Sequence, residues 1–263
     1  MFIIKIGGGK EINIKGVISD LATLNEKIII VHGANALRDE LAQKLNYEKK
    51  IITSLSGYDS VFSDEKMIDL AMMAYAGLKN KRIVELCQQK GINAVGLSGL
   101  DGKLIQGKRN SGIKVREGGK TLLLRDFSGK PKAINKQLLN LLLVNGYTPV
   151  LSIPLIDENN FAINSENDDI VAHLQMEMKA EKIISLIEAP RFLLDKNDPS
   201  SLVLKISKTE LETMEQKVEG RMKRKILAIR KLFDGGNTTV IISDGRTESP
   251  ILDALNGKGT TIT

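Results

Sequence analysis

Two lysines, Lys5 and Lys10, flank three consecutive glycines in the stretch IIKIGGGK near the start of the chain. Glycine loses more conformational freedom on folding than any other residue, so a run of three needs a reason. A plain turn is one reason. The other is a backbone that must come very close to an anion, with a lysine supplying the opposite charge. The stretch matches neither a Walker loop nor a GxGxxG fingerprint, so the common nucleotide-binding motifs do not describe it.

Three further stretches place polar residues where one predicted element gives way to the next. VHGAN, at residues 31–35, can aim backbone N–H groups at phosphate or carboxylate oxygens. In NSENDDIVA, Asn164 and Asp168 are four residues apart and can share one face, although Asp168 can equally be a helix-start acid favoured by the helix dipole. In GRMKRKILAIRK, Lys225 lies at the start of an amphipathic helix, a pattern that by itself indicates a solvated basic face.

The elements that position these stretches alternate between strand and helix. Six continuous apolar runs, typical of strands covered on both faces, begin at residues 2, 27, 93, 147, 182 and 238. Helical periodicity lies between them, at 64–79 with Ser63 as the predicted N-cap, at 135–145 and at 221–233. This alternation predicts an α/β protein, a three-layer α/β/α sandwich around a mainly parallel sheet. Ligands bind such sheets at the carboxyl ends of the strands, which is where the candidate stretches fall.

Two segments break this rhythm and predict hairpins. Residues 113–131 would turn at Gly118 and Gly119, and residues 153–164 would turn at 158–160. We expect a boundary between two lobes near residue 180, although no linker composition marks it.

Composition sets broad limits on function. The 263 residues are 42% hydrophobic and 27% charged, which is ordinary for a globular protein. The single cysteine, Cys87, excludes an internal disulfide and a multi-cysteine metal site, which fits a reducing cytoplasm. No stretch approaches the roughly 20 apolar residues of a membrane span. We therefore expect a cytoplasmic protein with no membrane partner and no metal held by protein ligands.

The positive charge is concentrated in one segment. Residues 103–132 hold nine basic and two acidic residues, a net +7, whereas the whole chain carries +6. Such a segment can steer an acidic partner, or it can be a solvated basic hairpin. Nucleic acid is a weaker candidate partner, because the segment lacks interleaved aromatic residues for base stacking.

Taken together, the four stretches resemble the amino acid kinase family, and more narrowly its acetylglutamate-kinase-like branch. The shared motifs are Lys-x-Gly-Gly, His-Gly, Asn-x-x-x-Asp and Gly-x-Met-x-x-Lys, in this order and at family spacings. The resemblance covers essentially the full length, including GLSGLDGKL and IISDGR. It implies a roughly eight-stranded, mainly parallel sheet between helices. It also implies an N-terminal lobe (1–180) that binds the acceptor and dimerises, and a C-terminal lobe (181–263) that binds ATP.

The resemblance further implies transfer of the γ-phosphoryl group of ATP to a carboxylate, giving an acyl phosphate. The implied catalytic residues are Lys5 on the transferring phosphoryl, Lys225 on the leaving phosphate, and Asp168 orienting both lysines. The implied nucleotide-binding residues are Gly7, Gly8, Glu188, Arg191 and Lys225, with Arg191 alternatively facing solvent. Mg²⁺ would arrive with ATP and be held largely by its phosphates.

The acceptor is the point at which the chain departs from its relatives. Kinases of free N-acetylglutamate carry an arginine in a Gly-Leu-Arg-Val-Thr stretch, but no arginine occurs here between residues 39 and 81. The segment SGYDSVFSDE is more similar to a sister group whose acceptor, α-aminoadipate or glutamate, is attached by its amino group to a small acidic carrier protein. Those enzymes often keep an arginine near the position of Val61. The expected acceptor-binding residues are Gly33, Ala34, Tyr58, Ser60 and Asn164.

We therefore expect an ATP-dependent kinase of carrier-linked α-aminoadipate or glutamate, serving lysine or arginine biosynthesis, with the basic segment 103–132 as the carrier's docking surface. Homodimer formation is implied by the family. A kinase of free N-acetylglutamate is the near alternative. A non-catalytic ligand-binding protein of the same fold is the alternative from another class.

Overall fold

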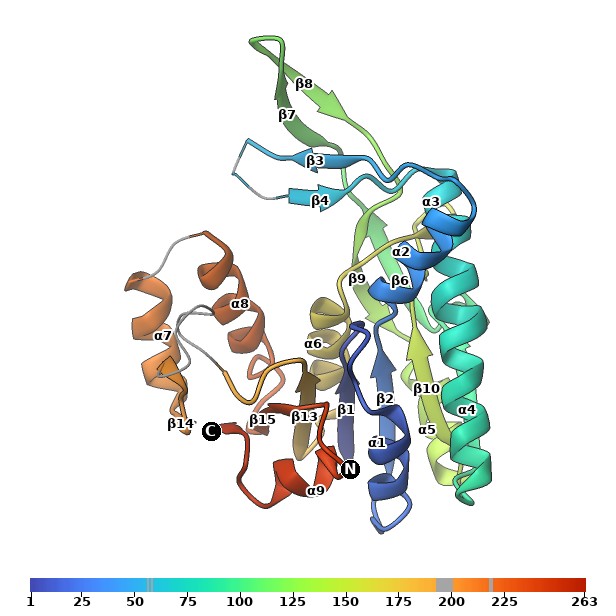
Figure 1. The fold of residues 1–263 in the computed structure, drawn as a ribbon, viewed down its shortest axis with the longest axis vertical. Coiled ribbons are helices and arrows are strands. Elements are labelled where there is room, and N and C mark those ends of the chain that lie inside the picture. Colours follow the sequence, from blue (N-terminus) through green and yellow to red (C-terminus); the bar gives the residue numbers. More distant parts are fainter. Residues whose placement is uncertain (56, 58, 193–200, 218–219) are drawn as a thin grey trace.

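An eight-stranded, mostly parallel sheet forms the centre of the protein in a computed structural model (Figure 1). The structure describes residues 1–55, 57, 59–192, 201–217 and 220–263. The strand order is β14-β16-β15-β13-β1-β2-β10-β5, and only the β15–β16 pair is antiparallel. The strands are β1 Phe2–Ile6, β2 Ile28–His32, β5 Ala94–Ser98, β10 Thr148–Ser152, β13 Lys182–Ile187, β14 Lys205–Ile206, β15 Thr239–Asp244 and β16 Thr260–Ile262. All six predicted strands are confirmed.

Helices cover both faces of this sheet, so the predicted three-layer sandwich is also confirmed. The apolar core divides accordingly: Ile3 of β1 packs into one layer, whereas Ile4 and Ile6 pack into the other, as alternation along a strand requires. One layer holds α1 (Ile14–Leu21), α4 (Asn80–Gln89) and α9 (Pro250–Leu255). The other holds α2 (Asn35–Lys44), α3 (Glu65–Ala71), α5 (Lys136–Val144), α6 (Asn167–Met178), α7 (Lys208–Lys217) and α8 (Gly220–Lys231).

The start of the predicted helix at 64–79 needs a correction. Asp64, not Ser63, is the N-cap of α3, and its carboxylate accepts a 2.9 Å hydrogen bond from the Met67 N–H. Both residue types suit an N-cap, but Ser63 is fully buried and its N–H donates to Asp126 instead. The helix also runs further than predicted, through a π-helix (η1, Met72–Lys79) into α4.

Hairpins extend beyond the carboxyl ends of the central strands. The β3–β4 and β7–β8 pairs project together from one end of the molecule (Figure 1), and Ser54 of the first bridges to Val115 of the second. The remaining strands form a four-stranded sheet, and η2 (Asp101–Lys103) is a single 3₁₀ turn. The bounds are β3 Ile51–Thr53, β4 Asp59–Val61, β6 Ile105–Arg109, β7 Ile113–Glu117, β8 Lys120–Leu124, β9 Gly129–Ile134, β11 Leu155–Ile156 and β12 Ala162–Ile163.

Both predicted hairpins are present. Gly118 and Gly119 form the β7–β8 turn, each with positive φ (56° and 78°), a backbone conformation that glycine adopts without steric cost. The first hairpin is shorter than predicted, because residues 129–131 belong to β9, which pairs with β6. In the part of the chain that the structure describes, no helix has the length and apolar character needed to cross a membrane.

A fully buried histidine, His32, ends β2 directly beneath the glycine loops. Asn80 donates a 3.2 Å hydrogen bond to Nε2, so Nδ1 carries the proton and faces the Gly33 carbonyl at 3.4 Å. Burial lowers the pKa of His32 to about 4, and the neighbouring Lys79 charge adds to this effect. The imidazole is therefore neutral in the folded protein at physiological pH.

This burial predicts a pH-dependent loss of stability. Because the unfolded chain binds a proton on His32 near pH 6.5 and the folded protein does not, acidification favours unfolding over the whole window from pH 6.5 to about 4. We expect about 1.6 kcal/mol of unfolding free energy to be lost between pH 6.5 and 5, with a slope that rises from about half of 1.4 kcal/mol per pH unit towards that value. Urea unfolding at both pH values measures it. His32→Gln should flatten this dependence, and an equal slope in both proteins would contradict the assignment.

Candidate active site

A cavity of about 1020 Å³ lies at the carboxyl ends of β1 and β2. It extends from the two glycine loops to the β3–β4 hairpin, with α6 on one side and α2 on the other. Residues from β1, α2, β4 and the α6 N-terminus line it together, although they are far apart in the sequence. This is the edge of the sheet at which ligands of α/β proteins bind.

The glycine loops after β1 and β2 touch each other at the base of the cavity. A Cβ added to Gly8 would lie 2.8 Å from the Asn35 nitrogen and 3.0 Å from the Ala34 nitrogen. A Cβ on Gly33 would lie 2.7 Å from the Gly8 Cα. Only glycine fits at either position without moving backbone. The N–H of Asn35, the first residue of α2, has no partner within the helix and is available to an anion in the cavity.

Two lysine–aspartate pairs lie beside these loops. Lys5, only 17% exposed, forms an ion pair with Asp168 in the first turn of α6, and Asp168 is 52% exposed. Lys231 of α8 donates a 3.1 Å hydrogen bond to the neighbouring Asp169. Both acids are favoured at this helix start by the dipole. The arrangement holds the Lys5 ammonium at the cavity wall and ties α8 to the same helix.

A buried hydrogen-bond network fixes the opposite wall. Asp126, which is buried, accepts from the Ser63 N–H at 3.0 Å and from the Ser128 hydroxyl at 2.6 Å. Ser63 in turn accepts from the Asn164 side-chain amide at 3.1 Å. Asn164, Ser63, Ser128 and Asp126 all line the cavity. Connected hydrogen bonds of this kind restrict the orientation of each member.

Two buried polar atoms at the start of α6 have no hydrogen-bond partner among the described residues. They are the Ser165 hydroxyl and the side-chain amide oxygen of Asn167, and both residues line the cavity. Buried polar groups in native proteins are bonded in the great majority of cases. Orphaned groups beside Lys5 and the glycine loops are therefore suited to a polar ligand or its water shell.

The α2 wall carries an arginine that the sequence interpretation did not assign. Arg38 lines the cavity with its side chain only 10% exposed, and its Nε and Nη2 both donate to Asp39, at 3.0 and 2.8 Å. Lys49 donates to the other Asp39 oxygen at 2.7 Å. Burial alone raises the pKa of the Asp39 carboxyl, but the hydrogen bonds from Lys49 and Arg38 outweigh it and hold that pKa below its usual value.

The structure brings most of the predicted site residues together. The cavity is lined by Lys5, Gly7, Gly8, Gly33, Ser60, Asn164 and Asp168. Ala34 is the buried N-cap of α2 and lies behind the lining. Glu188 and Arg191 do not line it, and Glu188 instead accepts a 2.6 Å hydrogen bond from the Glu11 N–H at the end of the first glycine loop. Tyr58 lies outside the described residues, and so does the side chain of Lys225, a residue of α8.

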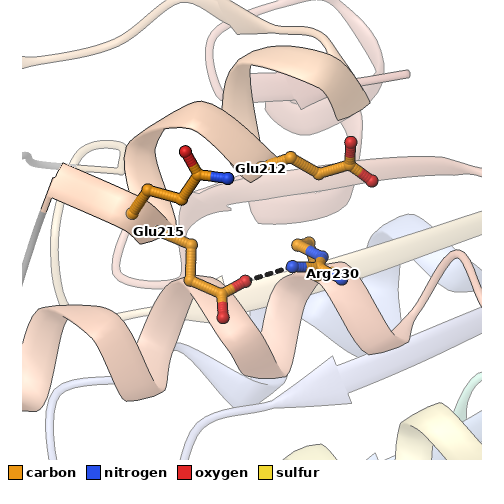
Figure 2. Close-up of a pocket in the computed structure, with 4 residues that line it drawn as sticks. Glu212, Glu215 and Arg230 are labelled. Carbon is orange, nitrogen blue, oxygen red and sulfur yellow. Dashed lines mark hydrogen bonds and ion pairs between the residues drawn. The ribbon is translucent and has the colours of Figure 1, made fainter.

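A second, smaller pocket of about 450 Å³ lies between α7 and α8 (Figure 2). Its walls are Glu212, Glu215, Gln216 and Arg230, and Glu215 and Arg230 form an ion pair across it. With its cation already paired, this pocket offers little to an anion. The chemistry-bearing residues converge on the larger cavity.

Several lining residues were missed by sequence reasoning. Asp126 is one of only two acids in the basic segment 103–132, and this contrast is the signal that could have identified it. Arg38 and Asp39 are adjacent residues of opposite charge, and no motif in the sequence marks them. Their place in the cavity follows from α2 beginning at the carboxyl end of β2, against the first glycine loop, a contact between segments far apart in the sequence that periodicity does not report.

Known proteins of one family are similar to this chain over most or all of its length. A model of the amino acid kinase family matches residues 1–244. A [LysW]-aminoadipate kinase from Thermus thermophilus is 39% identical over 268 residues, covering 100% of each chain. The corresponding protein from Deinococcus radiodurans is 37% identical, covering 100% of this chain and 91% of its own. A [LysW]-aminoadipate/[LysW]-glutamate kinase from Sulfolobus acidocaldarius is 30% identical over the full length of both.

Solved structures show the same fold at low sequence identity. An N-acetylglutamate synthase from Neisseria gonorrhoeae aligns with a TM-score of 0.77 at 18% identity, and this chain spans 59% of its length. An isopentenyl phosphate kinase aligns over 100% of both chains, with a TM-score of 0.63 at 18% identity. These likenesses establish the architecture alone.

Proposed function

Because this chain belongs to the amino acid kinase family and is thus a phosphotransferase, we propose that its acceptor is the side-chain carboxylate of α-aminoadipate or glutamate linked by its amino group to an acidic carrier protein. ATP would be the donor and an acyl phosphate the product. The observation that carries the proposal is the convergence of Lys5, Gly8 and Gly33 on one cavity at the sheet edge. The names of the full-length relatives supply the acceptor class.

The chemistry asks little of a general base, since a carboxylate is already an anionic nucleophile at neutral pH. The enzyme must hold two mutually repelling anions in line and stabilise charge on the transferring group. In this proposal Lys5 contacts the γ-phosphoryl group, and the Gly8 and Gly33 loops allow close backbone approach. Asp168 orients Lys5, and Asn164, held by Ser63, positions the acceptor. Donors fixed in a site with little water need no reorganisation during transfer.

The nucleotide is assigned to the C-terminal part. We propose that residues 1–180 bind the acceptor and form the dimer, and that residues 181–263 bind ATP, with Lys225 on the leaving phosphate. Glu188 would act by fixing the first glycine loop rather than by touching ATP. Orphaned oxygens of Ser165 and Asn167 suit the hydrated shell of Mg²⁺, held mainly by the phosphates. The reducing cytoplasm is the compartment that the single cysteine favours.

The β7–β8 hairpin is the proposed docking surface for the carrier. Lys114, Arg116 and Lys120 are exposed on it, and the Lys114 carbonyl accepts a 2.8 Å hydrogen bond from the Leu55 N–H next to β3. The hairpin therefore projects beyond the cavity wall that β3–β4 forms (Figure 1). A carrier seated there can extend its amino acid into the cavity.

Charge reversal of this hairpin provides a test. Lys114, Arg116 and Lys120 changed together to Glu should raise the KM for the carrier-linked acceptor at least ~10-fold at low salt, because an attractive field becomes repulsive. ATP affinity should stay unchanged. The matched control changes Lys27, Lys90 and Lys179 to Glu, since these exposed lysines lie near the amino ends of the central strands. An equal rise in KM in both triple variants would mean that the net charge of the protein, and not this hairpin, causes the effect. Loss of ATP binding in the hairpin variant would mean that the hairpin belongs to the nucleotide site.

Trapping the acyl phosphate with hydroxylamine while measuring ATP consumption tests the function itself. The acceptors are free N-acetylglutamate, carrier-linked α-aminoadipate and carrier-linked glutamate. Turnover with a carrier-linked acceptor alone is the expected result and names the amino acid. Turnover with N-acetylglutamate alone would instead support the alternative function, a kinase of free N-acetylglutamate in arginine biosynthesis. ATP binding without turnover of any of the three would favour a non-catalytic member of the fold.

A further inference from the structure

The position and charge of Arg38 suit it to bind a second carboxylate in the acceptor cavity. Its side chain is buried, and arginine is almost never buried unless its charge is compensated. Asp39 supplies that compensation but is shared with Lys49, so the cluster of Arg38, Asp39 and Lys49 keeps a net charge of +1. All three residues line the cavity. The net positive charge of this cluster makes its part of the cavity wall attractive to an anion.

The hydrogen bonds of Arg38 point to the same conclusion. A guanidinium has five N–H donors, and Asp39 accepts two of them, one from Nε and one from Nη2. No acceptor for the other three is found in the part of the chain that the structure describes. Two donors on one edge of the guanidinium match the two oxygens of a carboxylate. Asp39 and Lys49 hold the guanidinium in place for such a ligand.

The spacing suits an acceptor with two carboxylates. Arg38 lies three residues after Asn35, whose N–H starts α2 at the phosphoryl end of the cavity, so the two share a helix face. The rise between them is ~4.5 Å. Tyr75, another lining residue, donates its hydroxyl to Asn35 and lies close enough to Arg38 for that charge to oppose the burial-driven rise in its pKa. An amino acid of five or six carbons can span from the phosphoryl end to Arg38.

We propose that Arg38, held by Asp39 and Lys49, binds the carboxylate of the acceptor that is not phosphorylated. The inference rests on the proposed function for the acceptor class: an amino acid attached by its amino group keeps its α-carboxylate free while its side-chain carboxylate reacts. Arg38 thus supplies from α2 the cation that the β3–β4 segment lacks, where Val61 lines the cavity.

The test compares the natural acceptor with an analogue whose α-carboxylate is a carboxamide, both attached to the carrier. In the wild-type enzyme the carboxamide should raise KM ~100-fold, because a bidentate ion pair is lost. Arg38→Met should raise KM for the natural acceptor by a similar factor, with kcat changed less than ~5-fold. In the Arg38→Met variant, KM for the carboxamide analogue should exceed KM for the natural acceptor by no more than ~3-fold, because the ion pair is already absent. Arg82→Met, which removes an exposed arginine from α4, is the matched control and should behave as wild type.

Two further variants separate binding from folding. Arg38→Lys keeps the positive charge but loses the two parallel N–H donors of the guanidinium. Its KM for the natural acceptor should lie between those of the wild type and Arg38→Met. Val61→Arg in the Arg38→Met background places a new guanidinium in the same cavity and should recover at least ~10-fold in KM. An equal carboxamide penalty in wild type and Arg38→Met would overturn the inference. If only free N-acetylglutamate is phosphorylated, the proposed function fails, and the same comparison on its α-carboxamide still decides the role of Arg38.

Discussion

Replacing Lys5 by alanine is expected to lower kcat by at least ~10³-fold while leaving the protein folded. The loss of one fixed donor to a developing oxyanion costs ~10²–10³ in rate. Lys5 carries a full charge at the mouth of the two glycine loops, so its removal should reach or exceed that range. Stability should change little, because the partner Asp168 is half exposed and water can solvate it once Lys5 is gone.

The measurement is single-turnover phosphoryl transfer together with urea unfolding. Lys10→Ala is the matched control: the same substitution, five residues along the same glycine run, at an exposed lysine that does not line the cavity. Its kcat should stay within ~3-fold of wild type. Equal losses of kcat in the two variants, or a normal kcat for Lys5→Ala, would show that Lys5 is not a catalytic residue.

The sheet and its layers could be predicted from sequence because their signal is local. Continuous apolar runs such as IIIVH are typical of strands covered on both faces, and each of the six predicted runs is a strand of the central sheet. The local signal for where a helix begins is ambiguous when two adjacent residues are both good N-caps. Ser63 and Asp64 are both good N-cap residues, and the choice was decided by Asp126, 63 residues away in the sequence, which binds the Ser63 N–H.

The site was predictable only in part, for the same reason. Lys5, Gly8, Gly33 and Asp168 belong to short motifs and were found from them. Arg38 was missed because the sequence interpretation sought a cation between residues 39 and 81, the segment in which relatives carry it. The cation that binds an acceptor carboxylate can come from any element that lines the cavity. Here α2 carries the cation one residue outside that segment, and only the folded structure, in which α2 and β4 line the same cavity, shows it.

Gly8→Ala is expected to be the second most damaging substitution in the site, lowering kcat by ~10²-fold. Gly8 does not have a positive φ, so alanine suits its backbone, and lower chain entropy in the unfolded state would favour alanine by ~0.4–1 kcal/mol. Against this, the new methyl would lie 2.8 Å and 3.0 Å from the nitrogens of Asn35 and Ala34. These are backbone atoms at a helix start, and overpacking of this kind costs ~1–3 kcal/mol.

Packing therefore outweighs entropy, and the two loops must separate. A displacement of ~1 Å in a phosphoryl-binding loop can cost ~10²-fold in rate, and the methyl also shields the Asn35 N–H. Stopped-flow transfer rates and urea unfolding should show a slower reaction and a protein destabilised by ~1–2 kcal/mol. Gly77→Ala, on an exposed helix where the added Cβ meets only the Met72 carbonyl at 3.4 Å, should be neutral or slightly stabilising. A Gly8→Ala enzyme with wild-type kcat would mean that no anion approaches this backbone, and the glycines would then serve only the turn.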